Sequence, residues 1–399
     1  MNAGSSSLKC SVMESTDRTV LAQVKADWAG PVTRYERCGP GTARIREQVG
    51  FRDHGEAVRH VLEDLRTALG SAPAGERPAA VGHRIVHGGE FSAPVRITPA
   101  VRSRISALAE LAPLHNLPGL EALAEAETLL PDIPHVAVFD TAFHATLPPA
   151  ARIYPLPHAW TESWGIRRYG FHGLNHAYCT TRAAEMLGRP ASELRLVICH
   201  LGHGCSATAV LHGHSIDTTM GFTPLDGLMM ATRSGSVDPG ILTHVQRRHG
   251  LGAAEIDDAL NQASGLFGVS GMSGDMREVL AAGRAGHERA RLAIAIYVHR
   301  VRQAIGALAV TLGGIDALVF TAGVGENAAE VRMASCQGLE CLGVELDVDA
   351  NARCHPDADV ASRASRARVL VIAAREDLAM LSDVIRVVSA GVSAGKECI

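Results

Sequence analysis

Three glycine-rich segments, each combined with small polar or histidine residues, are the parts of this 399-residue chain best suited to chemistry. They are NAGSSS at 2–7, HLGHGCS at 200–206 and GVGEN at 323–327. Glycine lets the backbone turn tightly and approach a ligand, so successive amides can point at phosphate oxygens. Three such turns in one chain predict that it binds a nucleoside triphosphate.

Two arginines between these turns are candidates for the positive charge that phosphoryl transfer needs. Arg84 lies in an apolar run at 81–86, and Arg233 lies in TRSG at 232–235. A carboxylate is a poor nucleophile that repels the γ-phosphate, so an enzyme joining them must supply positive charge, alignment and exclusion of water. A guanidinium grips carboxylate or phosphoryl oxygens in a bidentate way and stays protonated. The arginines therefore favour phosphoryl transfer to a small carboxylate, whereas most arginines in proteins have structural roles.

Asp140 directly follows the apolar run at 136–139. The carboxyl end of a strand is where α/β proteins place working residues. An ionised carboxylate substrate has no proton to lose, so a general base is unnecessary in that direction. We expect Asp140 to orient an arginine or metal-bound phosphates; a helix N-cap or a satisfied buried acid is the alternative.

Short apolar runs alternate with amphipathic, alanine-rich stretches, which indicates α/β layers. We expect the main strands at 8–12, 20–24, 81–86, 136–139, 195–199, 206–211, 317–320 and 369–372. We expect the main helices at 54–69, 99–112, 120–130, 175–187, 288–310 and 376–387. Segments 2–12 and 200–210 both contain a glycine turn followed by a strand ending in valine, which suggests a duplicated strand–turn–strand unit.

Composition limits the class of protein. With 47% hydrophobic residues the chain can bury a large core, and its length favours two domains. A net charge of −4 with interspersed signs predicts neither a nucleic-acid nor a membrane partner. Nine cysteines without a CxxC pair indicate reduced thiols, and no long apolar run or signal segment is evident. We expect a cytoplasmic protein.

Blocks spread over nearly the whole chain resemble the acetate kinase family, within the acetate and sugar kinase/Hsp70/actin superfamily. They are NAGSSSLK at 2–9, GHRIVHGGE at 82–90, APLHN at 112–116, VFDTAFH at 138–144, RRYGFHG at 167–173, HLGHGCS at 200–206, DTTMGFTPLDGLMMATRSG at 217–235, SGMSGDMRE at 270–278 and FTAGVGEN at 320–327. Such long blocks in the family's order are far more specific than one glycine motif.

This resemblance implies an α/β fold of two ribonuclease-H-like (actin-like ATPase) domains with a cleft between them that holds the active site. The N-terminal domain would comprise 1–141 and 377–399, and the C-terminal nucleotide-binding domain 142–376. The implied reaction is reversible transfer of the ATP γ-phosphoryl group to acetate, giving acetyl phosphate and ADP. The implied cofactor is Mg²⁺, with Mn²⁺ as an alternative, and the implied assembly is a homodimer.

The resemblance also assigns residues. Arg84, Asp140, His172 and Arg233 would be catalytic, with Arg84 also holding substrate and His172 donating to the transferring phosphoryl oxygens. The nucleotide would be bound by Ser5, Ser7, Lys9, His200, Leu201, Gly202, His203, Gly204, Asp275, Met276, Arg277, Gly323, Val324, Gly325, Glu326 and Asn327. Because the chain has 19 histidines, a structural role is the alternative for His172 and more so for His200.

Metal and acyl sites follow from the same resemblance. Mg²⁺ keeps most of its waters and takes few protein oxygens, and the family pattern gives it Asn2 and Glu376. The histidines at 115, 144, 212 and 214 show no zinc-ligand spacing, so we expect no zinc. The residues that match the family's methyl pocket, or else belong to the core, are Val86, Leu114, Phe171 and Pro224. Such a pocket separates acids differing by one methylene by about 1–3 kcal/mol.

Three departures from the family pattern stand out. The family has a short apolar strand before NAGSSS, so we expect the first strand to be truncated here and the true start to lie upstream. His203 and Cys205 replace the family's Asn and Ala, and His203 adds bulk and a titratable group near phosphates. Arg375 is new beside Glu376, with which it could pair.

Three other functions remain open. One is a propionate or other short-chain acid kinase, which a substrate series separates from an acetate kinase. The second is a degenerate, non-catalytic nucleotide-binding homologue. The third is a phosphatase-like hydrolase, which would turn over ATP without any carboxylate.

Overall fold

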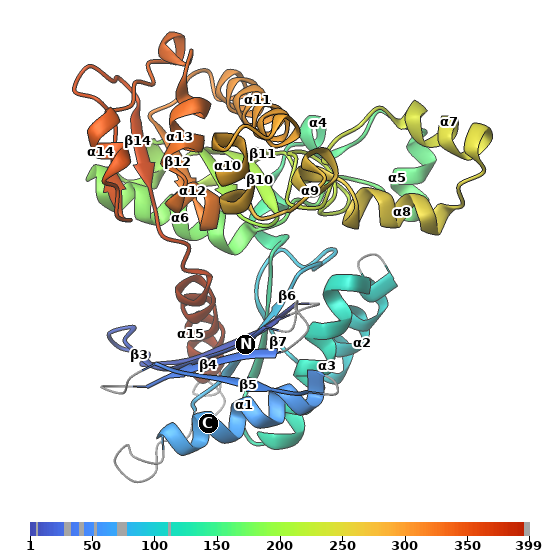
Figure 1. Cartoon of the computed structure of the whole chain (residues 1–399). Helices are drawn as coiled ribbons and strands as arrows, with labels where there is room; N and C mark the ends of the chain where they lie inside the picture. The colour runs from blue at the N-terminus through green and yellow to red at the C-terminus, as the bar shows by residue number, and fades with distance from the viewer. Residues whose placement is uncertain are drawn as a thin grey trace. The chain divides into compact units, whose positions relative to one another are not determined.

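The computed structural model describes residues 1–4, 7–27, 33–39, 44–51, 54–69, 78–110 and 113–394 (Figure 1). The chain divides into two compact units. Unit 1 is Met1–Ala142 with the C-terminal segment that begins at Arg375, and unit 2 is Phe143–Ala374. Both units combine sheets with helices, which confirms the predicted α/β class.

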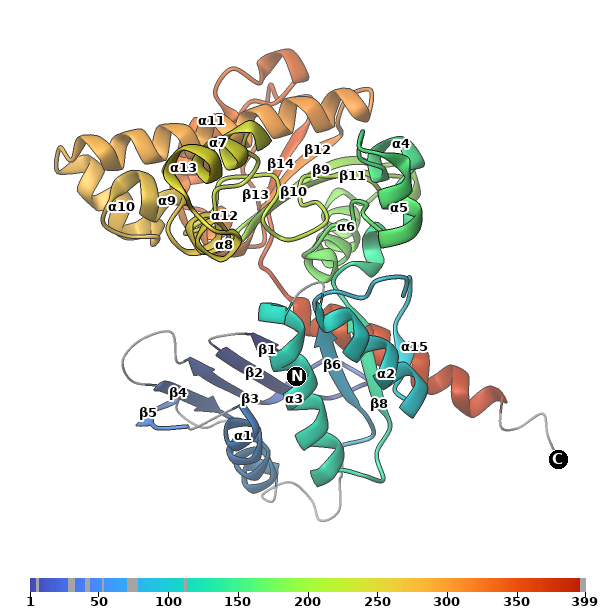
Figure 2. The same cartoon turned by 90° about the vertical axis from the view of Figure 1, so that its right-hand side faces the viewer.

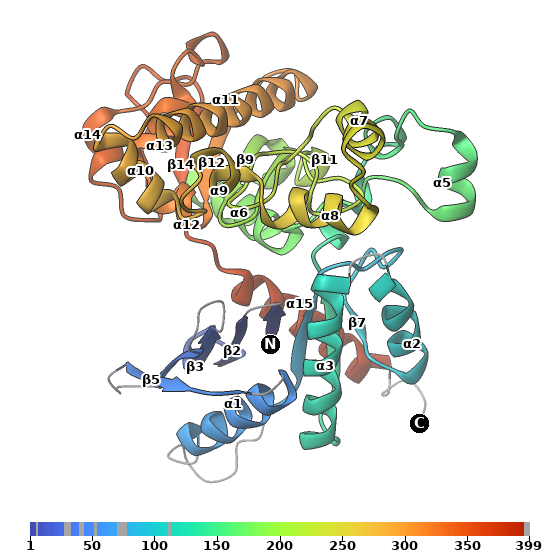
Figure 3. The ribbon, with the colours of Figure 1, turned by 45° about the vertical axis from the view of Figure 1, so that its right-hand side comes forward.

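Unit 1 contains a five-stranded antiparallel sheet in the order of the sequence. Its strands are β1 (Asn2–Gly4), β2 (Ser7–Met13), β3 (Val20–Asp27), β4 (Thr33–Cys38) and β5 (Ile45–Val49). Leu8 and Cys10 of β2 are buried and Lys9 between them is exposed, the alternation of a half-buried strand. Helix α1 (His54–Leu69) packs its apolar residues, among them Val58 and Val61, against the buried face (Figure 3).

A second, three-stranded sheet in unit 1 carries two of the predicted catalytic residues. Strand β6 (Val81–Ile85) runs parallel to β8 (His135–Phe139), and the short β7 (Val95–Arg96) pairs with the other side of β8. The backbone of residue 1 bonds to β6, because the Met1 amino group donates to the Gly82 carbonyl (2.7 Å) and the Arg84 amide donates to the Met1 carbonyl (3.0 Å). The surrounding helices are α2 (Pro99–Ala107), η1 (Leu108–Glu110), α3 (Pro113–Leu129) and α15 (Glu376–Ala394).

Unit 2 is built on a six-stranded sheet in the order β11-β10-β9-β12-β14-β13. Its strands are β9 (Arg195–Leu201), β10 (Cys205–Leu211), β11 (His214–Thr218), β12 (Ala317–Thr321), β13 (Ala358–Asp359) and β14 (Arg368–Val371). The central strands β9, β12 and β14 are parallel and almost wholly buried. Helices α6 (Gly173–Leu187) and α11 (Glu288–Thr311) lie on opposite faces (Figures 1 and 2). A parallel sheet covered on both faces has near-continuous apolar strands, as the sequence shows here.

Shorter helices surround this sheet. They are η2 (Ala142–Thr146), α4 (Pro149–Arg152), α5 (His158–Trp164), η3 (Ala191–Glu193), α7 (Pro239–His249), α8 (Ala253–Gln262), α9 (Gly265–Ser270), α10 (Met276–Arg284), α12 (Ala322–Asn327), α13 (Ala329–Cys336), η4 (Glu340–Leu342) and α14 (Val348–Ala352). None of the helices in the described ranges combines the length and hydropathy that a bilayer crossing requires.

Two of the glycine-rich segments each lie in a β-hairpin, as the similarity of 2–12 to 200–210 predicted. Strands β1 and β2 pair antiparallel with Gly4 opposite Ser7, and β9 and β10 pair antiparallel with Leu201 opposite Cys205. The third segment differs from the prediction. Residues 323–327 belong to helix α12, which begins directly after β12.

Three predicted helices have other bounds in the structure, and one of them, α15, continues to Ala394 instead of ending at 387. Helix α2 ends at Ala107 and continues as a 3₁₀ turn to Glu110, so the predicted helix at 99–112 is too long. Helix α3 begins at Pro113 rather than at 120. Pro118 inside α3 made its first turns look like a loop, yet an internal proline removes a single backbone donor and a packed helix tolerates it at a cost.

Candidate active site

A buried ion pair between Arg84 and Asp140 is the centre of the predicted site in unit 1. Parallel pairing of β6 with β8 sets Arg84 opposite Val138, so Asp140 emerges beyond the strand end beside the guanidinium. Arg84 Nε donates to Asp140 Oδ1 (2.9 Å) and Nη2 donates to Oδ2 (2.5 Å). The Asp140 residue is 1% exposed. This bidentate geometry fixes the plane of the Arg84 guanidinium.

Asn2 and Glu376 extend this pair into one network. Arg84 Nη1 donates to Asn2 Oδ1 (2.9 Å), and Asn2 Nδ2 donates to Glu376 Oε2 (3.2 Å). Glu376 Oε2 also lies 4.0 Å from Arg84 Nε. Burial alone would lower the pKa of Arg84, but the charges of Asp140 and Glu376 raise it, so Arg84 stays protonated.

Lys9 lies on the same side of the first hairpin as Asn2. The two residues are directly opposed in the β1–β2 register, and opposed residues of an antiparallel pair project to one face. Lys9 is exposed and Ser7 is half-buried, while Ser5 lies outside the described residues. A flexible cation is therefore available on the face that carries Asn2.

The oxygen donors of this network fit a hard divalent cation. Asp140 and Glu376 offer carboxylate oxygens and Asn2 offers an amide oxygen. Within the described ranges, no three His, Cys, Asp or Glu side chains cluster closely enough to hold a metal ion. Mg²⁺ suits such a site because it usually takes one or two carboxylates together with waters and substrate phosphates.

His172 occupies a strained position at the start of α6 in unit 2. Its φ is +58°, in the left-handed region that non-glycine residues rarely adopt. Its ring stacks on that of His200 with a centroid distance of 4.0 Å and an interplanar angle of 15°. His172 Nδ1 lies 2.9 Å from Ser206 Oγ, and His200 Nδ1 lies 2.8 Å from Asn175 Nδ2. Strain of this kind that is held by surrounding bonds is a frequent feature of functional sites.

The glycines of the β9–β10 turn open onto the histidines and Arg233. A Cβ on Gly204 would lie 3.3 Å from His172 Nε2 and 3.5 Å from Arg233 Nη2. A Cβ on Gly202 would lie 3.5 Å from His200 Nε2. The turn thus brings two predicted catalytic groups to one point, where any side chain larger than hydrogen would crowd them.

Arg233 differs from Arg84 in its partners within the described residues. Its Nη1 donates to the Pro224 carbonyl (2.9 Å), and no acidic side chain in the described part of the chain lies within ion-pair distance of it. Burial lowers the pKa of the Arg233 guanidinium. A half-buried, uncompensated guanidinium is suited to an anionic ligand, since an arriving charge would replace the missing partner.

The predicted nucleotide segment at 275–277 forms the start of α10. Asp275 caps the helix by accepting from the Arg277 amide (2.9 Å) and also pairs with the Arg277 side chain. The Met276 side chain is buried, so only its backbone can reach a ligand. His203 is exposed at the tip of the glycine turn; partial desolvation and the charge of Arg233 lower its pKa against the attraction of Asp275.

The segment at 323–327 is a short helix held from below by a buried arginine. Ala322, with φ of +65°, makes the sharp change of direction after β12. Gly323 and Asn327 are exposed, Val324 and Glu326 are half-buried and Gly325 is buried. Arg332, 1% exposed, donates Nη1 to the carbonyls of Gly325 (2.9 Å) and Glu326 (2.8 Å).

The predicted acyl-pocket residues are divided between the two units. Phe171 and Pro224 are buried in unit 2, and Val86 is buried in unit 1. The side chain of Leu114 lies outside the described residues.

Two departures from the family pattern have clear structural partners. Cys205 is buried, with Sγ 3.4 Å from the Gly202 carbonyl and 3.2 Å from Tyr297 Oη, and burial raises the pKa of its thiol to about 11. Arg375 forms a bidentate pair with Asp377 (2.9 and 3.0 Å). The pairing with Glu376 that the sequence suggested stays a prediction.

Three buried residues that position the site were missed by the sequence analysis. Ser206 and Asn175 bond to the two stacked histidines, and Arg332 holds α12. The spacing of His172 and His176 by four residues predicts one helix face and was the available signal for the Ser206 contact. For Arg332 the sequence contains no such signal, because nothing in the sequence distinguishes a buried arginine from an exposed one.

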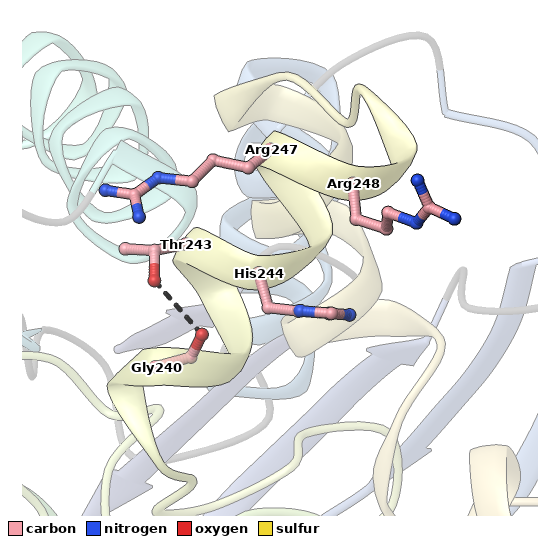
Figure 4. A pocket seen from close by; sticks show the side chains of 5 residues that line it. All are labelled: Gly240, Thr243, His244, Arg247 and Arg248. Atoms are coloured by element: carbon pink, nitrogen blue, oxygen red, sulfur yellow. Dashed lines mark hydrogen bonds between the residues drawn. The ribbon is translucent and has the colours of Figure 1, made fainter.

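The lining of a shallow pocket on α7 includes none of the predicted site residues. It is lined by Gly240, Thr243, His244, Arg247 and Arg248, all from that one helix (Figure 4). The arginine side chains spread in different directions, and Thr243 Oγ1 donates to the Gly240 carbonyl (3.1 Å). One exposed helix face of this kind does not enclose a small molecule.

Comparisons with known proteins agree with this picture. A model of the acetokinase family matches residues 1–382. The acetate kinase of Cyanothece sp. is 48% identical over 396 residues, which is 96% of each chain. The crystal structure of Porphyromonas gingivalis acetate kinase superposes with a TM-score of 0.89 at 39% identity, covering 97% of this chain and 98% of that one. A propionate kinase from Francisella tularensis superposes equally well, with a TM-score of 0.89 at 36% identity over 96% and 98%.

These matches and the α/β fold define a phosphotransferase. Within that class, the chain belongs to the acetokinase family, whose members use ATP. The matched region includes every residue assigned above.

Proposed function

We propose that this protein reversibly transfers the γ-phosphoryl group of ATP to acetate, giving acetyl phosphate and ADP, in the presence of Mg²⁺ or Mn²⁺. The observation that carries the proposal is Arg233, a half-buried guanidinium with no carboxylate partner in the described ranges, beside His172 at the glycine turn. A guanidinium in these surroundings is suited to bind an anion such as a phosphoryl group. A nucleotide-binding homologue without catalysis does not need such a guanidinium, and the dependence of turnover on an acid, tested below, separates a kinase from a hydrolase.

The reaction needs charge and alignment more than covalent chemistry. Arg84 and Arg233 would offset the repulsion between the acetate carboxylate and the phosphoryl oxygens, and His172 would donate a hydrogen bond from Nε2 to one of those oxygens. Asp140 would hold Arg84 in one orientation. Acetate attacks as its anion, so Asp140 need not accept a proton. The bond from the γ-phosphorus to the bridging oxygen of ADP breaks as the bond to the acetate oxygen forms.

The nucleotide and metal contacts are part of the same proposal. The backbone at 200–204, 275–277 and 323–327 would contact ATP, with Ser5, Ser7 and Lys9 near its phosphates. Asn2 and Glu376 would hold Mg²⁺, with Asp140 as a further oxygen donor. When bound, the metal supplies positive charge at the phosphate oxygens.

Acetate and propionate remain the two candidate substrates. Val86, Leu114, Phe171 and Pro224 are proposed to contact the methyl group. The Francisella tularensis protein named as a propionate kinase is as similar in structure as the named acetate kinase. A hydrophobic pocket distinguishes one methylene by about 10- to 200-fold, so the preference can be measured as a ratio of kcat/KM.

Trapping of the acyl phosphate with hydroxylamine tests the proposal. The protein is incubated with Mg-ATP and acetate, propionate, butyrate or no acid. We expect hydroxamate only with an acid, most from acetate. If propionate gives the most hydroxamate, the preferred substrate is propionate and the reaction class is unchanged. If ATP is turned over without any acid, the reaction is hydrolysis.

We also propose that the protein acts as a homodimer. In unit 2, large apolar side chains are strongly exposed, including Trp164 (61%), Leu292 (53%) and Val310 (76%). Light scattering coupled to gel filtration distinguishes about 42 kDa from twice that mass. A monomer at micromolar concentration would refute the dimer.

A further inference from the structure

A single buried hydroxyl joins two histidines of the site in unit 2. Ser206 Oγ lies 2.9 Å from His172 Nδ1 and 2.8 Å from His176 Nε2. Ser206 and His176 are 0% exposed, so water does not take part in these bonds. His172 and His176 come from the first turns of α6, and Ser206 comes from β10.

The number of protons in this arrangement restricts the tautomers. A serine hydroxyl has one proton and can accept two hydrogen bonds. It can therefore donate to only one of the two ring nitrogens and must accept from the other. His176 is neutral, because burial, together with the nearby His144 and His200 rings, lowers its pKa well below the ordinary value.

The surroundings of His176 Nδ1 determine which of the two histidine rings donates a hydrogen bond to Ser206 Oγ. That atom is buried and has no hydrogen-bond partner among the described residues. A buried N–H without an acceptor is rare in folded proteins. The His176 proton is therefore on Nε2, where it is donated to Ser206 Oγ. The Ser206 hydroxyl then donates to His172 Nδ1.

This places the proton of neutral His172 on Nε2, the ring nitrogen that faces the Gly204 turn and lies near Arg233. That nitrogen is 3.3 Å from the position of a Cβ on Gly204, and Arg233 Nη2 is 3.5 Å from the same position. In the opposite tautomer, Nε2 would present a lone pair there and repel an anion.

We infer that Ser206 is a positioning residue that, with His176, holds His172 as the Nε2–H tautomer and so presents a hydrogen-bond donor to the phosphoryl group. The identity of the anion as a phosphoryl group rests on the proposed function. The tautomer follows from the hydrogen bonds alone. The His172 proton stays on its ring throughout, so the role is hydrogen-bond donation and not acid catalysis. Ser206 acts through His172 and does not touch substrate.

The test pairs Ser206→Ala with a control on the same strand. Thr208 is also fully buried, lies two residues further along the same face of β10, and bonds Thr218 Oγ1 (2.8 Å) rather than a histidine. Two-bond ¹H–¹⁵N spectra of the histidine rings report each tautomer, and loss of a signal in His172→Gln assigns His172. Steady-state kinetics give kcat and the KM for ATP.

We expect wild-type protein and Thr208→Ala to show His172 as the Nε2–H tautomer without substrates. Ser206→Ala should show a mixture or the Nδ1–H form, with kcat lowered about 10- to 100-fold and KM for ATP within about threefold, the size of effect seen when partners that orient a histidine are removed. Ser206→Thr should restore both readouts. His176→Gln, whose amide can donate from near the position of Nε2, should retain the tautomer if a Ser206 variant fails to fold.

An unchanged tautomer in folded Ser206→Ala overturns the inference, as does an Nδ1–H form in the wild-type protein. A loss of kcat in Thr208→Ala equal to that in Ser206→Ala would also overturn it, since any buried hydroxyl would then serve. If the wild-type protein forms no acyl phosphate, the proposed function fails, and the spectra still decide whether Ser206 sets the tautomer.

Discussion

At the scale of residues, the two arginines of the candidate site have different hydrogen-bond partners. Arg84 is fixed by a bidentate carboxylate and an asparagine, whereas Arg233 has a backbone carbonyl as its hydrogen-bond partner. A guanidinium whose charge is already compensated positions a ligand, and one whose charge is not compensated attracts it. We therefore expect the two arginines to respond differently to substitution.

The first prediction concerns Arg233. Arg233→Ala should lower kcat at least about 10³-fold, because an arginine on the transferring phosphoryl group contributes that much in related reactions. The affinity for ATP should change little, since the backbone turns hold the nucleotide. Arg233→Lys should recover part of the rate, as a point charge lacks the guanidinium fork.

Arg284→Ala serves as its control. Arg284 is exposed, pairs with Glu330 on the surface of unit 2 and is outside the proposed site. Near-normal turnover in Arg233→Ala, measured beside this control, would contradict the role of Arg233.

The second prediction concerns the Arg84–Asp140 pair. Asp140→Ala leaves a buried guanidinium with less compensation and should lower the free energy of unfolding by about 3 kcal/mol. Asp140→Asn should cost less, because the amide oxygen still accepts one bond. Urea unfolding measures both values.

Asp27→Ala provides the comparison within unit 1. Asp27 forms a surface ion pair with Lys25, and its loss should cost less than about 1 kcal/mol. Equal effects for Asp27→Ala and Asp140→Ala would show that the buried pair does not stabilise the unit.

At the scale of elements, helix α12 depends on a residue outside it. Arg332 of α13 holds the carbonyls of Gly325 and Glu326 and also bonds both the Oδ1 and the carbonyl of Asn351. The exposed face of α12 is therefore supported from its buried side. This arrangement explains how a segment with two glycines keeps one conformation.

The third prediction follows from that support. Arg332→Met should lower the free energy of unfolding by about 2–3 kcal/mol, since several buried oxygens lose their donor. The KM for ATP should rise while kcat changes little, because α12 is proposed to contact the nucleotide. Calorimetry and steady-state kinetics measure the two effects, with exposed Arg353→Met as the control. A stable variant with normal KM would contradict the role of Arg332.

The sequence predicted the buried strands well and the exposed ones poorly. The apolar runs at 81–86, 195–199 and 317–320 correspond to β6, β9 and β12 with ends that differ by two residues at most. Strands β4 and β5 were missed because their sequences, TRYERC and IREQV, contain several charged residues and no apolar run. They are held by backbone pairing with their neighbours, and the ion pairs Glu36–Arg46 and Glu47–Arg37 add cross-strand contacts that depend on the fold.

The candidate site divides in the same way. Asp140 was expected to orient an arginine or metal-bound phosphates, and the structure shows it paired with Arg84. Ser206, Asn175 and Arg332 were not found, because the role of a buried polar residue depends on partners distant in sequence. Helix α12 was not predicted for another reason. It begins at Ala322, whose positive φ cannot be inferred from the sequence.

At the scale of the whole molecule, both units bury neutral histidines. In unit 1, His83 Nε2 lies 2.9 Å from His135 Nδ1, and burial lowers the pKa of both rings. In unit 2, burial lowers the pKa of His144 to about 4 and that of His176 well below its ordinary value. The unfolded chain binds protons at these residues below about pH 6.5, whereas the folded chain does not.

The fourth prediction is therefore a loss of stability in mild acid. Because the unfolded state binds more protons, the free energy of unfolding falls as pH drops from about 6.5 towards 4, by up to about 1.4 kcal/mol per pH unit for each such histidine. Between pH 7 and 8 these residues should have no effect. Melting temperatures across this range measure the slope, and His144→Gln should reduce it. A melting temperature that does not change between pH 7 and 5 would contradict the neutral state of these rings.

The central claim is that a carboxylate, not water, receives the phosphoryl group, and ³¹P NMR of one reaction mixture tests it most directly. Protein, Mg-ATP and acetate are combined, and ATP, ADP, acetyl phosphate and inorganic phosphate are followed together. We predict that ADP and acetyl phosphate appear in equal amounts, that no inorganic phosphate accompanies them beyond slow hydrolysis, and that added ADP and acetyl phosphate regenerate ATP. Inorganic phosphate appearing in place of acetyl phosphate, or an unchanged spectrum from folded, ATP-binding protein, would contradict the account.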